Sequence, residues 1–355
     1  MDIMKKINVL ITGAGAPGII GTIYSLKKNN DRREINIVGT DMNVNAIGKY
    51  ACDRFYQVPS ARDFSRYFMS LREICANEEI SIIIPQNTME LESLASNIPL
   101  FDEINVKLLL PNAKSISIAN NKYLLLEKAK DLKLPTGKFK LVNTYSDLKV
   151  FAEELGWPNE KVVAKLPVSN GMRGLRIISE STDELGLFLN EKPTSTFVKL
   201  DYFRILFQKG LKELLVCEYL PGDEYSVDLL RTKTQTVILP RKRIAIRSGI
   251  SFDTAIEKDD QIIEYSRILS DSLGLENCFG FQFKRNMLGV PCLLECNPRV
   301  QGTMVCSVFA NQNIIYKGVK NLLGEPMESD ETNWGVRFMR YWGGLAISDQ
   351  GIEWM

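Results

Sequence analysis

The sequence predicts an α/β protein that opens with a parallel sheet and continues into a larger α+β part. Between residues 7 and 111, apolar runs such as INVLITG, INIVGTD and ISIIIP alternate with helical patterns, which is typical of parallel strands covered on both faces. Farther along the chain, strand patterns come in pairs joined by tight turns. The 355 residues are enough for two or three packed units.

The composition is that of a globular protein, with 45% hydrophobic and 25% charged residues. The net charge of +1 gives no reason to expect binding to nucleic acid, and no apolar run reaches the length of a membrane span. Seven cysteines without a C-x-x-C pair are typical of reduced thiols, so we expect a cytoplasmic protein. Histidine is absent, which leaves carboxylates, lysines, arginines and metal ions as the available catalytic chemistry.

The first residues, MDIMKKINVLITGAG, resemble a signal peptide, but the apolar run passes into a glycine turn, so we interpret it as a buried strand. The turn from Gly13 to Gly18 fits G-x-G-x-x-G, and Asp41 ends the next strand at the spacing of a ribose-binding carboxylate. Alone, these features predict an NAD-binding domain. Against this, Pro17 removes one N–H group that a pyrophosphate would use.

A polar segment, Pro85–Leu91, follows another strand of this sheet. It lies at the carboxyl edge, where ligands gather in open α/β sheets, so a substrate contact is one interpretation. Asn87 equally suits the cap of a helix that begins here.

A second feature is a predicted hairpin with strands Phe279–Arg285 and Cys292–Asn297 and a turn around Leu288 and Gly289. Side chains alternate between the faces of a strand, so Glu295 and Asn297 point the same way, and the pairing would place Gln282 opposite Glu295. Three oxygen donors on one face suit Mg²⁺ bound together with nucleotide phosphates.

The string E-C-N-P-R at residues 295–299, preceded by a strand glutamine, resembles the metal site of the ATP-grasp superfamily. The likeness is closest to the large subunit of carbamoyl-phosphate synthase and its stand-alone relatives. The resemblance implies that Gln282, Glu295 and Asn297 bind two Mg²⁺ ions, with Mn²⁺ as a substitute, and that Arg299 contacts phosphate. It also implies a Rossmann-like pre-ATP-grasp domain over residues 1–112, which in this family generally binds no dinucleotide. An ATP-grasp domain would follow over 113–355, with a lid subdomain at about 140–217.

Two lysines match the family's phosphate contacts. Lys122 leads a helix, where a solvated lysine is an equally good interpretation. Lys165 ends the strand Val162–Lys165, and a lysine there is costly to bury without an anion. The loop that follows, residues 167–174, resembles the glycine-rich lid of the family, and the resemblance assigns Gly171 and Arg173 to the nucleotide.

The stretch ELLVCEYLPGDEYSVD, from Glu213 to Asp228, predicts two strands around a Pro-Gly turn. It resembles the family's hinge. The resemblance implies that Glu218, Tyr219 and Leu220 read the adenine edge and that Glu224 holds the ribose hydroxyls.

A basic cluster at residues 241–243 is commonly a solvated patch. In the family interpretation, Arg243 or Arg247 would face the γ-phosphate or an acidic substrate, because arginine binds carboxylate and phosphate through two bonds. We expect Gln301–Thr303 to continue the wall of the site. The tail, Gly335–Ile347, is interpreted as a closing strand whose aromatic residues belong to the core.

The resemblance implies an ATP-dependent ligase that activates a small carboxylate as an acyl phosphate and joins it to an amine or ammonia. A carbamoyl-phosphate-type enzyme that phosphorylates carbamate or bicarbonate is a close alternative. A nucleotide-binding regulatory protein without ligase activity and an NAD-binding oxidoreductase are alternatives from other classes. The sequence leaves the oligomeric state open, a homodimer included.

Overall fold

The structure is a computed structural model that describes residues 4–169, 171–183, 185–186, 189 and 196–355. Contacts divide the chain into two compact units. The first comprises Met1–Ser117, Tyr225–Phe281 and Cys296–Met355, and the second comprises Ile118–Glu224 and Gln282–Glu295. The division passes through two neighbouring strands, β14 (Asn277–Arg285) and β15 (Pro291–Asn297).

The first unit begins with the predicted parallel sheet, which confirms the Rossmann-like arrangement. Its strand order is β3-β2-β1-β4-β5, and every neighbouring pair is parallel. The order reverses between β1 and β4, so the turns after these two strands meet at a switch point. The strands are β1 (Ile7–Thr12), β2 (Ile35–Asp41), β3 (Arg54–Gln57), β4 (Ile82–Pro85) and β5 (Lys107–Leu108).

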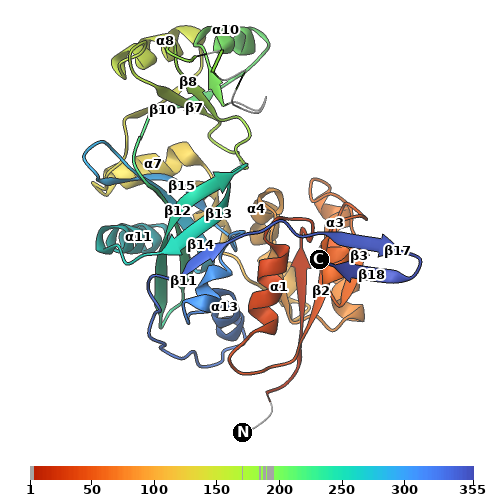
Figure 1. Cartoon of the computed structure of the whole chain (residues 1–355). Helices are drawn as coiled ribbons and strands as arrows, with labels where there is room; N and C mark the ends of the chain where they lie inside the picture. The colour runs from red at the N-terminus through yellow and green to blue at the C-terminus, as the bar shows by residue number, and fades with distance from the viewer. Residues whose placement is uncertain (1–3, 170, 184, 187–188, 190–195) are drawn as a thin grey trace. The chain divides into compact units, whose positions relative to one another are not determined.

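Helices cover both faces of this sheet, as the unbroken apolar strands predict. Val9 and Ile11 of β1 pack in one core cluster with helix α1, whereas Leu10 between them packs in another with α3 and α5. Figure 1 shows these helices in red and orange around the sheet. They are α1 (Ile19–Lys27), α2 (Gly48–Ala51), α3 (Phe64–Asn77), η1 (Thr88–Glu90), α4 (Leu91–Ser96), α5 (Ile98–Asp102) and α6 (Ala113–Ala119).

The rest of the first unit is built on a six-stranded sheet in the order β15-β14-β11-β12-β13-β16. Its strands β11 to β13 are antiparallel, and apolar residues of this part share a core cluster with α1 and β1. Its elements are β11 (Glu224–Arg231), β12 (Thr236–Arg247), β13 (Ile250–Ile256), α11 (Asp260–Leu273), α12 (Cys306–Phe309), α13 (Ile314–Leu322) and β16 (Arg337–Met339).

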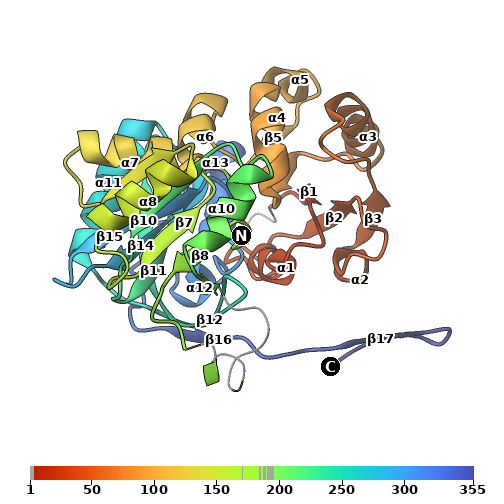
Figure 2. The same ribbon diagram turned by 90° about the horizontal axis from the view of Figure 1, so that it is seen from above.

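The second unit holds a five-stranded sheet in the order β6-β10-β7-β8-β9, with the helices α8 and α10 packed on it through a core around Leu148, Phe203 and Val216. Figure 2 shows these elements in yellow and green. They are α7 (Lys122–Asp131), β6 (Phe139–Val142), α8 (Tyr145–Glu154), β7 (Val162–Lys165), β8 (Arg176–Ile178), β9 (Phe197–Val198), α10 (Asp201–Gln208) and β10 (Leu214–Glu218). The predicted α/β fold is therefore confirmed.

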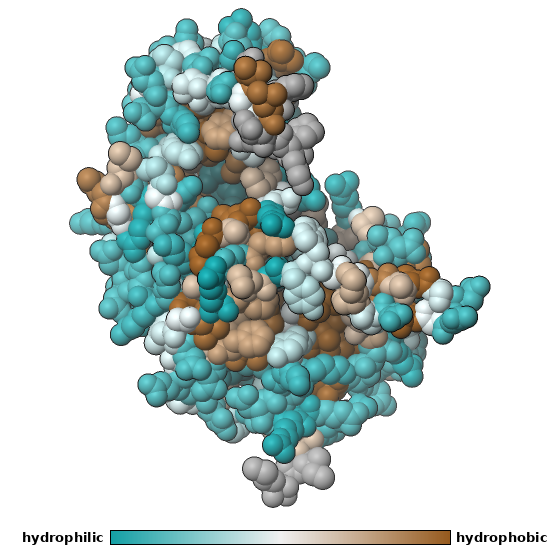
Figure 3. Space-filling model, in the orientation of Figure 1, coloured by the Kyte–Doolittle hydropathy of each residue, from teal (hydrophilic) through white to brown (hydrophobic). Residues whose placement is uncertain are grey.

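The tail corrects one expectation. Strand β16 does close the larger sheet beside β13, but Tyr341 and Trp342 beyond it are 84% and 72% exposed, so they are not core residues. The last strands, β17 (Leu345–Ser348) and β18 (Gly351–Trp354), pair with each other and carry exposed apolar side chains, some of them brown in Figure 3. Within the described ranges, no helix is long and apolar enough to cross a bilayer.

Candidate active site

Lys122 is the first residue of helix α7. The side chain of Asn121 caps this helix by accepting from the amides of Tyr123 and Leu124, which fixes where the lysine leaves the turn. The Lys122 ammonium donates to the carbonyl of Ser169 at 2.7 Å and lies 3.5 Å from Oε2 of Glu295.

Only 6% of Lys122 is exposed, so the solvated interpretation is wrong. Burial lowers the pKa of this ammonium, the charge and hydrogen bond of Glu295 act in the opposite direction, and the charge of Lys165 lowers the pKa as well. The net lowering of the Lys122 pKa is therefore due to lost hydration, which an anionic ligand would compensate.

Lys165 ends strand β7 and is also 6% exposed. Its ammonium donates to the carbonyl of Leu294 at 3.2 Å, and within the described residues it has no carboxylate partner. An ammonium held by a neutral carbonyl is poorly compensated for its lost hydration. Among its described residues, the second unit thus contains two buried lysines, of which Lys122 is paired with a carboxylate, that of Glu295.

A narrow apolar slot of about 20 Å³ lies next to Lys165. This volume is too small for an aromatic ring, so a planar ligand could enter only if the slot widened. Its lining residues come from α7, β6, β7, β10, β15 and the segments beside them: Leu126, Gly137, Phe139, Lys165, Cys217, Glu218, Leu220, Leu293 and Leu294.

The predicted hinge borders this slot. The Glu218 carboxylate accepts from the amide of Lys138 at 3.0 Å, so part of its bonding capacity is used within the chain. By contrast, the main-chain amides and carbonyls of Tyr219 and Leu220 have no hydrogen-bond partner in the described part of the protein. Unpaired main-chain groups beside an apolar slot are suited to the polar edge of a base.

The two strands around the hinge turn are confirmed as β10 and β11, and the amide of Gly222 closes the turn onto the carbonyl of Arg285 at 2.9 Å. Glu224 is the first residue of β11 and is half-buried. The ring of Tyr219 is flanked by the ammonium groups of Lys161 and Lys284, each 5.4 Å from its centroid.

The predicted lid loop follows Lys165. Gly171 and Gly174 have φ angles of +59° and +70°, a left-handed conformation that glycine adopts without strain. Arg173 between them is exposed. Asn170, which belongs to the predicted lid, lies outside the described residues.

The predicted metal hairpin forms, with Gly289 in a left-handed turn and the amide of Asn286 donating to the carbonyl of Val290 at 3.0 Å. This bond centres the turn on Leu288 and not between Leu288 and Gly289, so the condition for pairing Gln282 with Glu295 is not met at the turn. Continued without a bulge, the register places Leu294 opposite Gln282. Gln282 of β14 and Glu295 and Asn297 of β15 are each partly exposed next to buried neighbours.

Among the described residues, no three His, Cys, Asp or Glu side chains cluster as a metal site would require. The predicted set is of another kind, with one carboxylate and two amides. Gln282 and Glu295 belong to the second compact unit, and Asn297 belongs to the first.

Arg299, in the first unit, donates from Nε to the hydroxyl of Thr88 at 3.1 Å. Thr88 lies in the segment Pro85–Leu91, where the helix-start interpretation is confirmed, because Asn87 and Glu90 form a capping box. The arginine of the E-C-N-P-R string is thus in contact with the carboxyl edge of the parallel sheet.

Arg243 donates to Oγ of Ser251 at 3.0 Å and to the carbonyl of Gly249. The Arg247 guanidinium lies over the ring of Phe252, 4.7 Å from its centroid. Arg241 differs from the solvated patch that the sequence suggested, because it is 1% exposed and pairs through two nitrogens with Asp228.

The glycine turn after β1 is occupied by its own chain. Oδ2 of Asp41 accepts from the amide of Gly15 at 2.8 Å, so this amide, a candidate donor to a pyrophosphate, is already bonded within the chain. A Cβ atom added to Gly18 would come within 2.7 Å of the Cα of Gly302, which shows how closely the start of α1 is covered.

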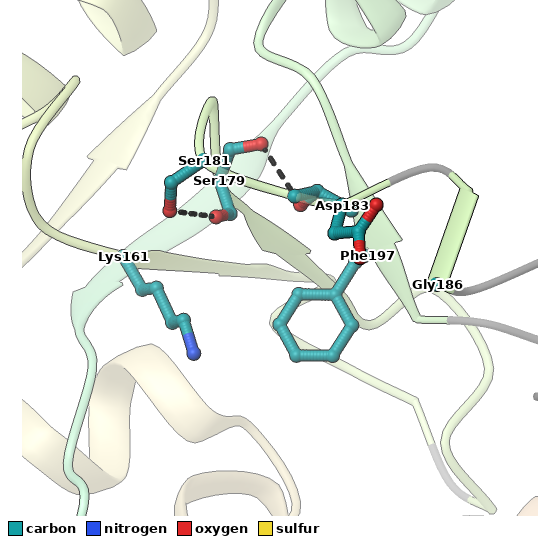
Figure 4. A pocket seen from close by; sticks show the side chains of 7 residues that line it. Lys161, Ser179, Ser181, Asp183, Gly186 and Phe197 are labelled. Carbon is teal, nitrogen blue, oxygen red and sulfur yellow. Dashed lines mark hydrogen bonds between the residues drawn. The ribbon is translucent and has the colours of Figure 1, made fainter. Parts of the chain in front are cut away.

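Sequence reasoning missed a pocket of about 270 Å³ in the second unit (Figure 4). Its lining includes the hydroxyls of Ser179 and Ser181, 3.3 Å apart, and the stem of Lys161, whose ammonium lies 5.3 Å from the ring centroid of Phe197. No sequence pattern marks it, because its residues come from separate loops and strand ends.

Two protein-family profiles match separate parts of the chain. Residues 9–109 match the PylC-like N-terminal domain, and residues 210–341 match an ATP-grasp family described as belonging to the biosynthetic pathway with the Ter operon. No curated protein matches the chain significantly.

Solved structures share the fold at low identity. The N5-carboxyaminoimidazole synthetase from Staphylococcus aureus complexed with ADP is 15% identical, with a TM-score of 0.68 over 94% of this chain and 82% of that one. The biotin carboxylase domain of Hydrogenobacter thermophilus 2-oxoglutarate carboxylase, in complex with MgADP, ADP and bicarbonate, is 16% identical, with a TM-score of 0.66 over 93% and 73%. The L-amino acid ligase from Bacillus licheniformis is 12% identical, with a TM-score of 0.62 over 91% and 75%.

The parallel sheet, the following ATP-grasp part and the two profile matches agree with one another and with the motifs of the sequence. Together they support an ATP-grasp protein: residues 210–341 match an ATP-grasp family, and the solved structures share the fold over most of the chain.

Proposed function

We propose that the chain is an ATP- and Mg²⁺-dependent ligase that activates a carboxylate as an acyl phosphate and joins it to an amine or ammonia. ADP and phosphate would be released. The observation that carries the proposal is the pair of buried ammonium groups, Lys122 and Lys165, of which Lys165 has no carboxylate partner among the described residues. Buried cations in excess of anions are costly, and the polyphosphate of ATP would supply the missing negative charge.

The base would enter the slot beside Lys165 once the slot widens. Its apolar walls, among them Leu126 and Leu293, would contact the ring faces. The unpaired main-chain groups of Tyr219 and Leu220 would bind the polar edge, and Glu224 would hold the ribose hydroxyls. Leucine side chains can move between staggered rotamers, which gives the slot a way to widen.

Gln282, Glu295 and Asn297 would hold the metal, two ions in our proposal, with Mn²⁺ as a substitute. The donor set fits, because all three side chains offer oxygen ligands, and Glu295 lies 3.5 Å from the Lys122 ammonium, beyond an ordinary hydrogen bond. Bound Mg²⁺ neutralises phosphate charge. Lys122, Lys165 and Arg299 would orient the transferring group and stabilise its charge, while Gly171, Arg173 and the rest of the lid loop exclude water. Arg243 would face the acidic substrate.

The comparison structures support this reaction class because their names include a synthetase, a carboxylase and an L-amino acid ligase. Phosphorylation of bicarbonate or carbamate is a second candidate, since one of these structures holds bicarbonate together with MgADP. In both cases the substrates are small molecules, and we expect the reaction to take place in the cytoplasm.

The first experiment measures the melting temperature with Mg-ATP and, separately, with NADH, for the native chain and for Glu295→Gln. We expect a rise with Mg-ATP that weakens in Glu295→Gln and is unchanged in Glu153→Gln, a control at an exposed position of α8. ADP release is then assayed with mixtures of carboxylic acids and amines, and separately with bicarbonate. A rise with NADH alone would refute the proposal.

A further inference from the structure

Arg340 lies directly after strand β16 in the first unit. Its main-chain amide donates to the carbonyl of Phe252 at 2.7 Å, which fixes the backbone at the sheet edge. Its Nη2 donates to the carbonyl of Gly302 at 2.6 Å and contacts the hydroxyl of Thr303 at 3.3 Å. The guanidinium therefore packs against the segment Gln301–Thr303, which the sequence marked as a wall of the site.

The Arg340 guanidinium lacks a counterion in the part of the chain that the structure describes. Nε is buried without a hydrogen-bond partner, and Nη1 makes no hydrogen bond within the described residues. Its other contact is the ring of Phe338, 5.7 Å away. Burial lowers the pKa of Arg340, and the neighbouring charge of Arg241 lowers it further.

Two arginines of the neighbouring sheet each form an ion pair with an aspartate. Arg241 lies 2.9 Å from Asp228, and Arg337, three residues before Arg340, lies 2.6 Å from Asp253. Partial burial of a guanidinium next to another arginine and without a carboxylate costs stability. A charge kept in such a place is a candidate for ligand recognition.

We propose that Arg340 binds an oxyanion, the carboxylate or phosphate of the substrate that is not the nucleotide. The proposal rests on the proposed function, since it assigns a contact to the second substrate of that reaction. Nη1 and Nε are the atoms left to donate, and the planar guanidinium suits both kinds of oxyanion. The carbonyl of Gly302 and the hydroxyl of Thr303 hold the other edge of the group in place.

The first test measures melting temperatures in chloride buffer without other anions. Because Arg340 is held without a counterion, we expect Arg340→Gln to leave the melting temperature unchanged or to raise it. Arg337→Gln is the matched control, since it removes a paired guanidinium from the same strand and should lower the melting temperature. If Arg340→Gln lowers it more than Arg337→Gln does, Arg340 is structural and the proposal is overturned.

The second test titrates sodium phosphate and sodium acetate against chloride at constant ionic strength. We expect at least one anion to raise the melting temperature of the native chain in a saturable way, by roughly 2–4 °C. The rise should disappear in Arg340→Gln, persist in part in Arg340→Lys, and persist fully in Arg337→Gln and Lys165→Met. An effect of acetate alone would identify a carboxylate, and an effect of phosphate alone a phosphorylated substrate.

Three results would overturn the proposal: no rise in the native chain, a rise that survives in Arg340→Gln, or a rise that is lost in Lys165→Met. The last would place the anion at the nucleotide site instead. If the anion effect depends on Arg340 but Mg-ATP does not stabilise the native chain, the proposed function fails and the anion site stands.

Discussion

Replacing Lys165 with methionine should separate binding of the nucleotide from stability of the fold. Methionine keeps most of the side-chain length and apolar contact but removes the charge. Lys165 is 6% exposed, and its ammonium bonds to a single neutral carbonyl, that of Leu294. In the free protein this charge is poorly compensated, whereas with ATP bound it would face a phosphate.

The expected effect of Lys165→Met is therefore small on the stability of the free protein and large on Mg-ATP binding. Without ligand, the hydrogen bond that is lost, roughly 1.5–3 kcal/mol, is offset by the desolvation of the charge that the variant avoids, so we expect a net change within about 1 kcal/mol. With ligand, removing one partner of a buried charge pair costs roughly 2–5 kcal/mol, which weakens Mg-ATP binding roughly 30- to 4,000-fold.

Isothermal titration calorimetry measures the affinity for Mg-ATP. Urea unfolding without ligand measures the free energy of unfolding. Lys149→Met, at an exposed position of α8, is the control and should change neither. If Lys165→Met lowered the free energy of unfolding by several kcal/mol and left Mg-ATP affinity intact, Lys165 would be a structural lysine and the argument from buried charge would fail.

Two further predictions concern the core and the lid. Burial raises the pKa of Glu90 above its ordinary value of 4.5, although the hydrogen bonds from Thr12 and Tyr67 act in the opposite direction. The contribution of Glu90 to stability is therefore present at low pH and is lost as the pH rises through the raised pKa. We therefore expect the urea midpoint of the native chain to fall relative to that of Glu90→Gln as the pH rises from about 4 to 8. If the two midpoints changed with pH in parallel, this prediction would be contradicted. In the lid, Gly174→Ala should destabilise more than Gly171→Ala and slow ADP release more. Both glycines have positive φ, which costs a non-glycine residue roughly 1–2 kcal/mol, but the new methyl at Gly174 would lie 2.6 Å from Leu166. Equal effects in thermal melts and activity assays would show that this contact relaxes.

The sequence by itself determined the elements that depend on neighbouring residues. Continuous apolar runs predicted the parallel sheet, and strand patterns predicted the hairpin of β14 and β15. Asn87 caps a helix as its position suggests, since a cap needs only the next two or three amides. The residue types of the E-C-N-P-R string also indicated the superfamily, because five adjacent residues of distinct chemistry form a specific local pattern.

Only the tertiary structure decided which charges are buried and which are paired. Asp41 has the spacing of a ribose ligand, yet its carboxylate bonds to the amide of Gly15. Arg241 and Arg340 look alike in the sequence, but one pairs with Asp228 and the other has no acid among the described residues. The partner of a charged group comes from a distant part of the chain and is set by packing, because the free energy of a charge depends on every neighbour it meets in the folded protein.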